Sequence, residues 1–290
     1  MPILAAASLL ALTAIAAVVP GAQGPASRLT AAPTAATPFG TNDTAARRLT
    51  VDGTAIYYEV YGEGPPVLLL HGGLYGYIAE YAPYIVELAK RHTVIAVATR
   101  GHGRSEVGSA PYTHDLLAAD AIAVLRRETR EAALVIGFSY GAQTAFRLAA
   151  RHPAAVRKVV VIGAGFAPSP QAVEWARGLT ADGFARDNAG FVAGRKAIMP
   201  RPEEWPRFFE LLRASLLQTP DLTPAETSAI RCPVLIVGGD RDFYNPVSVF
   251  HGVHGRLAGS RLIILKDADH VQSLVRPDVL RNHVLPFLAE

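Results

Sequence analysis

Short apolar runs alternate with amphipathic segments along most of this 290-residue chain, and this alternation constrains the fold more than any other feature. The segments predicted as central strands are almost entirely apolar, at residues 67–70, 93–98, 133–138 and 156–162. Between them lie segments with helical spacing, at 81–90, 116–128 and 142–150. Strands that are apolar on both faces belong to parallel sheets covered on both sides. The sequence therefore predicts an α/β fold with a doubly wound, mostly parallel sheet.

The alternation begins and ends with further strand and helix signals. Runs at 49–51 and 55–60 flank Asp52-Gly53, a strong hairpin signal. Late strands are predicted at 234–237 and 262–265, and helices at 247–257 and 271–288. Together these segments indicate one domain over residues 47–290.

A long insertion interrupts the pattern. From about residue 164 to 230 the chain has no convincing strand, but it has helical stretches at 172–179, 184–198 and 206–217. A helical insertion within a doubly wound sheet is typical of a cap over a functional site. Most aromatic residues of this insertion are expected to form the core of the cap itself.

The N-terminal segment has the composition of a targeting signal. No charged side chain precedes Arg28, and residues 3–19 form an Ala/Leu/Val-rich run closed by Pro20-Gly21. This pattern is typical of a cleaved signal peptide, with a membrane anchor as the alternative. We expect residues 1–26 to direct the protein to a secreted or periplasmic location, or to tether it to the membrane if they are not cleaved. Residues 27–46, rich in Ala, Thr and Pro, are predicted to be a flexible linker.

Charge and cysteine content exclude several classes of function. The formal net charge is +3 with acidic and basic residues interspersed, which argues against a nucleic-acid-binding surface. Cys232 is the only cysteine, so an intramolecular disulfide and a cysteine-rich zinc site are both excluded. Its place before Pro233, at the start of an apolar strand, predicts a packing role. No cofactor or metal is expected, and the oligomeric state stays open.

Ser139 lies at the centre of Gly137-Phe138-Ser139-Tyr140-Gly141, where a predicted strand passes into a helix. A serine in such a tight turn has a strained backbone, and its hydroxyl projects above the sheet. The flanking glycines allow the strand and the helix to approach closely. The start of the helix also favours a developing negative charge. This context predicts that Ser139 is a nucleophile.

Several motifs in a fixed order resemble those of the α/β-hydrolase superfamily, and the resemblance covers nearly all of residues 47–290. Besides the Ser139 turn, they are His71-Gly72-Gly73, the segment Arg-Gly-His-Gly-Arg-Ser at 100–105, Gly-Asp-Arg-Asp at 239–242, and Asp269-His270. The resemblance implies an α/β-hydrolase fold with a helical cap. One departure is Thr99, where the family usually has Asp before Arg-Gly-His-Gly, and we expect it to alter a loop contact.

A hydroxyl nucleophile needs a base, and the base needs an orienting carboxylate. His270 follows a predicted strand, at the sheet edge where ligands gather, and is the predicted base. The resemblance favours Asp242 over Asp240 as the carboxylate, with Asp240 shaping the turn. The chain order Ser139, Asp242, His270 also matches that of the superfamily.

The remaining site residues are expected near the mouth of the site. The oxyanion hole is predicted to use the backbone N–H of Tyr140 and that of Gly73 or Leu74. Tyr75 and Tyr77 are predicted to contact the substrate.

Together these residues predict a serine hydrolase that cleaves an ester, lactone or related acyl bond of a small molecule through an acyl-enzyme. Carbon–carbon bond hydrolases, cofactor-free haloperoxidase-like enzymes and acyltransferases share the same triad and remain alternatives. A non-catalytic ligand-binding protein on this scaffold is the alternative from another class.

Overall fold

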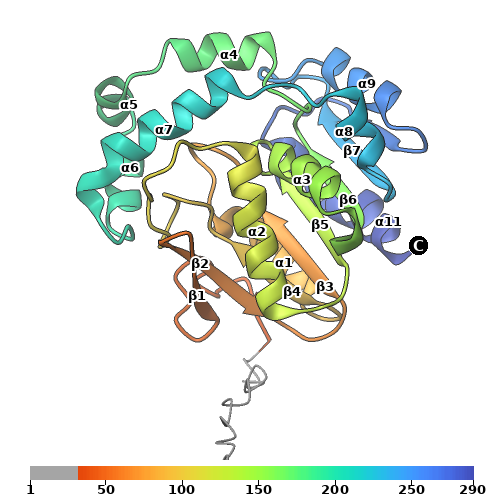
Figure 1. Cartoon of the computed structure of the whole chain (residues 1–290), viewed down its shortest axis with the longest axis horizontal. Helices are drawn as coiled ribbons and strands as arrows, with labels where there is room; N and C mark the ends of the chain where they lie inside the picture. The colour runs from red at the N-terminus through yellow and green to blue at the C-terminus, as the bar shows by residue number, and fades with distance from the viewer. Residues whose placement is uncertain (1–31) are drawn as a thin grey trace, which may run out of the picture.

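An eight-stranded sheet in the order β1-β2-β4-β3-β5-β6-β7-β8 forms the centre of the computed structural model, which describes residues 32–290 (Figure 1). The strands are β1 (Ala46–Val51), β2 (Thr54–Tyr61), β3 (Pro66–Leu70), β4 (Thr93–Val97), β5 (Ala133–Phe138), β6 (Val156–Ile162), β7 (Val234–Gly239) and β8 (Arg261–Leu265). β2 pairs antiparallel with β1 and β4, and every other pairing is parallel. The predicted α/β fold is confirmed. The predicted signal peptide, residues 1–26, lies outside the described residues.

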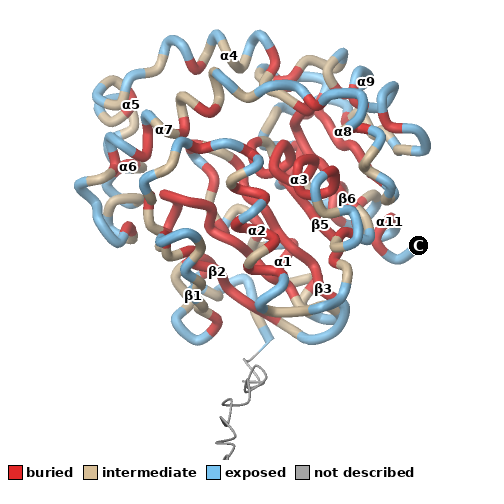
Figure 2. The backbone as a smooth tube through the Cα atoms, in the orientation of Figure 1, coloured by how far each residue is buried: buried red, intermediate tan, exposed pale blue. Residues whose placement is uncertain are grey.

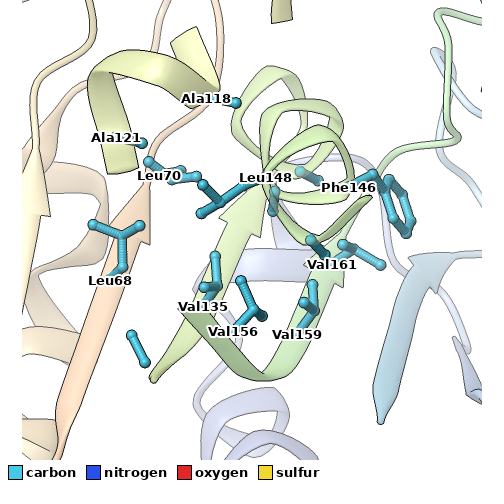
Figure 3. Packing of buried hydrophobic residues seen from close by; sticks show 14 of the residues in the cluster. Leu68, Leu70, Ala118, Ala121, Val135, Phe146, Leu148, Val156, Val159 and Val161 are labelled. Atoms are coloured by element: carbon cyan, nitrogen blue, oxygen red, sulfur yellow. The ribbon is translucent and has the colours of Figure 1, made fainter. Parts of the chain in front are cut away.

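Helices cover both faces of the sheet because its central strands are apolar on both faces. One face packs against α2 (His114–Glu128), α3 (Tyr140–Arg151) and α9 (Val247–Arg256). The other packs against α1 (Ala82–Leu88) and the C-terminal helices. The strands form the buried centre in Figure 2. Figure 3 shows strand residues such as Leu68, Val135 and Val159 facing helix residues such as Ala118, Phe146 and Leu148.

The cap lies between β6 and β7. It contains α4 (Pro170–Arg177), α5 (Ala181–Asp187), α6 (Ala189–Lys196), α7 (Trp205–Gln218) and α8 (Pro224–Ala229). Figure 1 shows α4 to α7 grouped on one side of the sheet. Aromatic residues of these helices, including Phe184, Trp205 and Phe208, form a third apolar cluster with Leu74 and Tyr140 of the main domain. The cap is therefore packed onto the segments that carry the predicted site.

Two helices predicted as continuous are interrupted. The segment 184–198 is split between α5 and α6 by Asn188, whose φ of −128° and ψ of 40° are not helical. The segment 271–288 forms α10 (Gln272–Val275), the π-helix η4 (Val279–Val284) and α11 (Leu285–Ala289). Arg276 precedes Pro277 and is extended, with ψ of 124°, because proline disfavours helical geometry in the residue before it. None of the helices in residues 32–290 is long and apolar enough to cross a membrane.

Part of the segment predicted as a flexible linker is packed on the main domain. Phe39 and Ala45 are buried, and the backbone N–H groups of Gly40 and Asn42 donate to the carboxylate of Glu59 at 2.7 and 2.9 Å. The hydroxyls of Tyr57 and Tyr61 also donate to this fully buried carboxylate. A buried carboxylate needs such donors. The segment before β1 is therefore ordered by Glu59, which its composition does not reveal.

Cys232 lies just before β7. It is partly buried against the apolar core, and this burial raises the pKa of its thiol to about 11. It is therefore a packing residue that stays protonated at neutral pH.

A buried ion pair links the loop after β4 to α2. The Arg100 guanidinium is buried and donates to the two carboxylate oxygens of Asp120 at 2.6 and 2.8 Å. Its remaining donors reach Thr54 Oγ1 at 2.7 Å and the carbonyl oxygen of Val51 at 3.3 Å. Arg100 thus connects β1, β2 and α2 to the loop that precedes the Gly-His-Gly motif.

We expect Asp120→Asn to lower the free energy of unfolding by about 3–5 kcal/mol, because it leaves a buried guanidinium without its countercharge. Urea denaturation followed by circular dichroism measures this. The matched control is Asp187→Asn, which removes an exposed carboxylate paired with Arg186, and it should leave the urea midpoint unchanged. Equal losses in the two variants would contradict the role of the buried pair.

Candidate active site

Ser139 occupies a tight turn between β5 and α3. Its backbone has φ of 52° and ψ of −115°, a conformation that is strained for a residue with a side chain. The turn requires close approach of the strand and the helix. A Cβ at Gly141 would lie 2.0 Å from the carbonyl oxygen of Leu70, and one at Gly137 would lie 2.5 Å from that of Gly141. The two glycines of the motif are therefore required by packing.

The structure brings the three predicted triad residues together. His270 Nε2 lies 3.0 Å from Ser139 Oγ, and His270 Nδ1 lies 2.7 Å from Asp242 Oδ2. The Asp242 side chain is fully buried, and that of His270 is 14% exposed. Asp242 follows β7 and His270 follows β8, so neighbouring parallel strands deliver both residues to the same edge of the sheet.

The buried carboxylate of Asp242 is oriented by its own loop. Its Oδ1 accepts the backbone N–H groups of Tyr244 and Asn245, both at 2.9 Å, which leaves Oδ2 for His270. The Asn245 side chain donates to the carbonyl oxygen of Gly163 at 2.9 Å. Asp240 instead accepts the N–H of Ala268 at 3.1 Å and so joins the two loops. The sequence analysis missed Asn245, for which the only signal was a short polar side chain three residues after the carboxylate.

Gly73 and Leu74 lie beside the turn that carries Ser139. A Cβ at Gly73 would lie 3.4 Å from Tyr140 Cβ, so the two segments are in contact. Within residues 32–290, neither the N–H of Gly73 nor that of Leu74 donates to a protein acceptor. Tyr140 is the first residue of α3, so its N–H has no acceptor within the helix. Tyr140 is thus adjacent to Ser139 in sequence, and the loop with Gly73 and Leu74 lies against it in space.

Two buried histidines support this loop from behind. His71 Nδ1 donates to the carbonyl oxygen of Gly72 at 2.8 Å, and its Nε2 accepts the backbone N–H of Thr99 at 3.0 Å. His102 Nε2 lies 3.2 Å from the carbonyl oxygen of Gly73, to which the Nε2–H tautomer donates. The Nδ1 atom of His102 lies 2.9 Å from Thr99 Oγ1 and 3.1 Å from the carbonyl oxygen of Arg100.

Burial lowers the pKa of His71 to about 4 and that of His102 well below its ordinary value. Both rings are therefore neutral near pH 7, with a single N–H each. Thr99 contacts both rings: its N–H donates to His71 Nε2, which places the His71 proton on Nδ1, and its hydroxyl lies beside His102 Nδ1. An Asp at position 99, usual in the superfamily, has no side-chain hydroxyl to donate. The expected loop contact of Thr99 is thus a contact with both histidines.

A cavity of about 410 Å³ opens above Ser139 and His270. Its lining is mostly apolar and comes from both the main domain and the cap, and it includes Leu74, Tyr75, Phe138, Trp175, Leu216, Tyr244, Val271 and Leu274. Tyr75 therefore lies where the sequence predicts it, and its ring also contacts Phe184 and Phe191 of the cap. Within residues 32–290, no group of three or more His, Cys, Asp or Glu side chains is arranged to hold a metal ion.

The prediction for Tyr77 is wrong. Tyr77 does not line the cavity, because its ring packs over Gly40 and Gly103, where a Cβ would lie 2.1 and 2.6 Å from ring atoms. The Arg195 guanidinium covers the ring, 4.4 Å from its centroid. The two glycines and Arg195 are distant in sequence, so the direction of the Tyr77 side chain could not be inferred from its neighbours.

Comparison with known proteins agrees with this geometry. Residues 67–282 match the sequence model of the alpha/beta hydrolase family. The chain belongs to this family. Serine hydrolase BPHL of Mus musculus is 27% identical to this chain, and the match covers 86% of this chain and 88% of BPHL. 2-(Acetamidomethylene)succinate hydrolase of Mesorhizobium japonicum is also 27% identical, and the match covers 83% of this chain and 94% of that protein. The crystal structure of the enol-lactonase from Burkholderia xenovorans superimposes with a TM-score of 0.68 and 26% identity, covering 84% of this chain and all of that one. The protein is therefore an enzyme of the hydrolase class.

His114, the first residue of α2, is a third buried histidine and contacts α3, the helix that follows Ser139. The His114 ring packs on that of Tyr140, with centroids 4.4 Å apart, and its Nδ1 lies 2.9 Å from Thr144 Oγ1. Its Nε2 is buried without a partner among the described residues, and burial lowers the pKa of His114 to about 3. Like His71 and His102, it is neutral in the folded protein.

These histidines should make the fold sensitive to acid. Each has a folded pKa below the ordinary value of about 6.5, so the unfolded chain binds more protons as the pH falls. The contribution of these histidines to the free energy of unfolding should therefore be fully present above pH 6.5 and fall between pH 6.5 and 4, by up to about 1.4 kcal/mol per pH unit for each histidine.

Urea denaturation at a series of pH values measures this slope. We expect His114→Gln to make it shallower, and the exposed His254→Gln to leave it unchanged. An unfolding free energy that is flat from pH 7 to 4.5 would contradict neutral burial of these rings.

Proposed function

We propose that this hydrolase cleaves an ester, lactone or related acyl bond of a small molecule, with Ser139 as nucleophile, His270 as general base and Asp242 as the orienting carboxylate. The observation that carries the proposal is the continuous chain of hydrogen bonds from Asp242 through His270 to Ser139, at the floor of an apolar cavity. The names of the relatives, a serine hydrolase and an enol-lactonase, support the same class of chemistry.

Each residue has a defined step in this mechanism. Ser139 Oγ attacks the carbonyl carbon while His270 Nε2 takes its proton, and the buried Asp242 stabilises the resulting imidazolium. His270 then returns the proton to the leaving alcohol, which departs and leaves an acyl group on Ser139. Water, activated by the same histidine, attacks the acyl group and releases the acid. The proton is returned to Ser139, so the cycle closes without a cofactor.

The oxyanion of the tetrahedral intermediates would be bound by the N–H of Tyr140 together with that of Gly73 or Leu74. The carbonyl of Gly72 and the N–H of Gly73 form one peptide group. The carbonyl of Gly73 and the N–H of Leu74 form the next one. These are the two carbonyls that His71 and His102 hold. The histidines therefore orient and polarise the donor peptides from the opposite side. Such a donor stabilises the transition state by about 3 kcal/mol.

The lining of the cavity favours a small, mostly apolar acyl or alcohol group. Polar lining atoms are few, and Asn245 is already bonded to Gly163. The cap supplies Trp175 and Leu216, so exchange of substrate and product involves contacts between cap and main domain. Tyr75 lines the cavity between cap and loop, and we propose that it contacts the substrate.

A fluorophosphonate probe tests the role of Ser139, because the reagent labels an activated serine. We expect wild-type protein to be labelled at Ser139 and Ser139→Ala to be unlabelled and inactive. Asp242→Asn should fold but label and turn over at least about a thousandfold more slowly, because it favours the wrong histidine tautomer. Equal labelling of wild type and Ser139→Ala would refute the nucleophile, and absence of labelling in folded wild type would favour a non-catalytic binding protein.

Thr99 offers a test of the oxyanion hole. Thr99→Val removes the hydroxyl that faces His102 but keeps the N–H that His71 accepts, so we expect kcat to fall about tenfold with little change in KM. Thr99→Ser retains the hydroxyl and should restore kcat. Steady-state kinetics with an activated ester measures both. A rise in KM at constant kcat, or no rescue by serine, would contradict the positioning role.

A further inference from the structure

Glu80 places a carboxyl group on the wall of the cavity that contains Ser139 and His270. The residue lies in the short helix η1 (Ile78–Tyr81), in the segment that follows His71-Gly72-Gly73. Its Oε1 accepts the backbone N–H of Gly72 at 2.6 Å. Among the residues of 32–290 that line the cavity, Glu80 carries the only acidic side chain. No step of the proposed mechanism uses it.

No side chain within residues 32–290 forms a hydrogen bond with this carboxyl, which the backbone N–H of Tyr77 also approaches. The nearest cationic group, the Arg195 guanidinium on α6, is directed at other acceptors: its Nη2 donates to the carbonyl oxygens of Tyr75 and Gly76 at 2.6 and 3.1 Å. Glu80 therefore forms no ion pair. A carboxyl that lines an apolar cavity without a countercharge is costly to ionise.

The protonation state follows from these contacts. Burial raises the pKa of Glu80 to about 8, against the opposing effects of the Gly72 N–H, of Arg195 and of the Tyr77 N–H. The carboxyl is therefore mostly protonated at neutral pH. Because Oε1 accepts from Gly72, we place the proton on Oε2. A protonated carboxyl on the wall of a mostly apolar cavity is a hydrogen-bond donor for a bound molecule.

We propose that Glu80 is a specificity-determining residue that selects substrates whose acyl chain carries an oxygen acceptor, such as a keto oxygen, by donating a hydrogen bond from Oε2. The inference rests on the proposed function of Ser139 and deepens it. A substrate oxygen that gives up its water on entering the cavity finds a replacement donor at Glu80, whereas an all-carbon chain leaves the Glu80 hydroxyl unpaired. A site built around a buried polar group discriminates against analogues that lack its partner.

Two matched pairs of esters test this. Ethyl levulinate is compared with ethyl isocaproate, and ethyl acetoacetate with ethyl isovalerate, because the members of each pair have the same number of heavy atoms and differ in a keto oxygen. The measured quantity is the ratio of kcat/KM within each pair, followed by acid release. Intrinsic differences in ester reactivity cancel when this ratio is compared between variants.

We expect Glu80→Leu to lower the keto-to-alkyl ratio about tenfold in at least one pair. Glu80→Gln should keep the ratio, because its amide can accept from Gly72 and donate from Nε2. Glu87→Gln, which changes an exposed glutamate of α1 that pairs with Lys90, is the matched control and should not move the ratio. An unchanged ratio in Glu80→Leu for both pairs would overturn the inference.

The pH dependence provides a readout that a purely structural role would not move. The ratio in wild type should fall above about pH 8, as the carboxyl ionises and ceases to donate, and should stay flat in Glu80→Gln. His270, Arg195 and the tyrosines at positions 75, 81, 140 and 244 also face this region. Burial raises the pKa of these tyrosines above its ordinary value, and all of these groups act on both members of a pair, so their effects cancel in the ratio. A wild-type ratio that does not change from pH 6.5 to 9 would contradict a donating carboxyl.

A cationic substrate gives a distinct outcome. If Glu80 instead bound an ammonium group, the wild type would favour ethyl γ-aminobutyrate over the keto and alkyl esters. Glu80→Gln would lose this preference, and neither protein would favour the keto esters. That result would overturn the inference. Failure of the proposed function itself would differ from both, since no ester would then be hydrolysed and Ser139 would not react with a fluorophosphonate.

Discussion

The close approach of β5 and α3 at Ser139 is the constraint on which the site depends. It exists because Gly137 and Gly141 have no side chains, and it forces Ser139 into a backbone conformation with φ of 52°. Such strain persists only where the surrounding structure supports it. Here the support is a sheet apolar on both faces, with α3 buried along nearly its whole length. The core thus stabilises a turn that is unfavourable on its own.

The parallel sheet then determines where the partners of Ser139 lie. Asp242 and His270 follow β7 and β8, and the loop with Gly73 follows β3, so the C-terminal ends of several strands meet around one hydroxyl. The buried histidines behind this loop and the cap packed above it surround the same place with buried side chains. A preorganised site with mostly apolar walls strengthens the electrostatic interactions within it.

Local patterns in the sequence predicted the sheet, the cap and the meeting of Ser139 and His270 at one sheet edge, because the ends of parallel strands converge there whatever the details of packing. The choice of Asp242 over Asp240 came from the resemblance to α/β-hydrolases. They did not predict contacts that depend on distant residues. Tyr77 turns away from the cavity because Gly40 and Gly103 leave room for its ring. The order of the segment before β1 depends on the buried Glu59. Glu80 lines the site through a bond to Gly72 that no periodicity reveals.

The central claim is that an acyl group is carried by Ser139 during turnover. Rapid acid quenching of the enzyme with an excess of a slowly deacylating ester, followed by peptide mass spectrometry, tests it most directly. We expect a mass increase equal to the acyl group on the peptide that contains Ser139, appearing no later than the released alcohol. Release of alcohol without an adduct on Ser139, or an adduct on another residue, would contradict it.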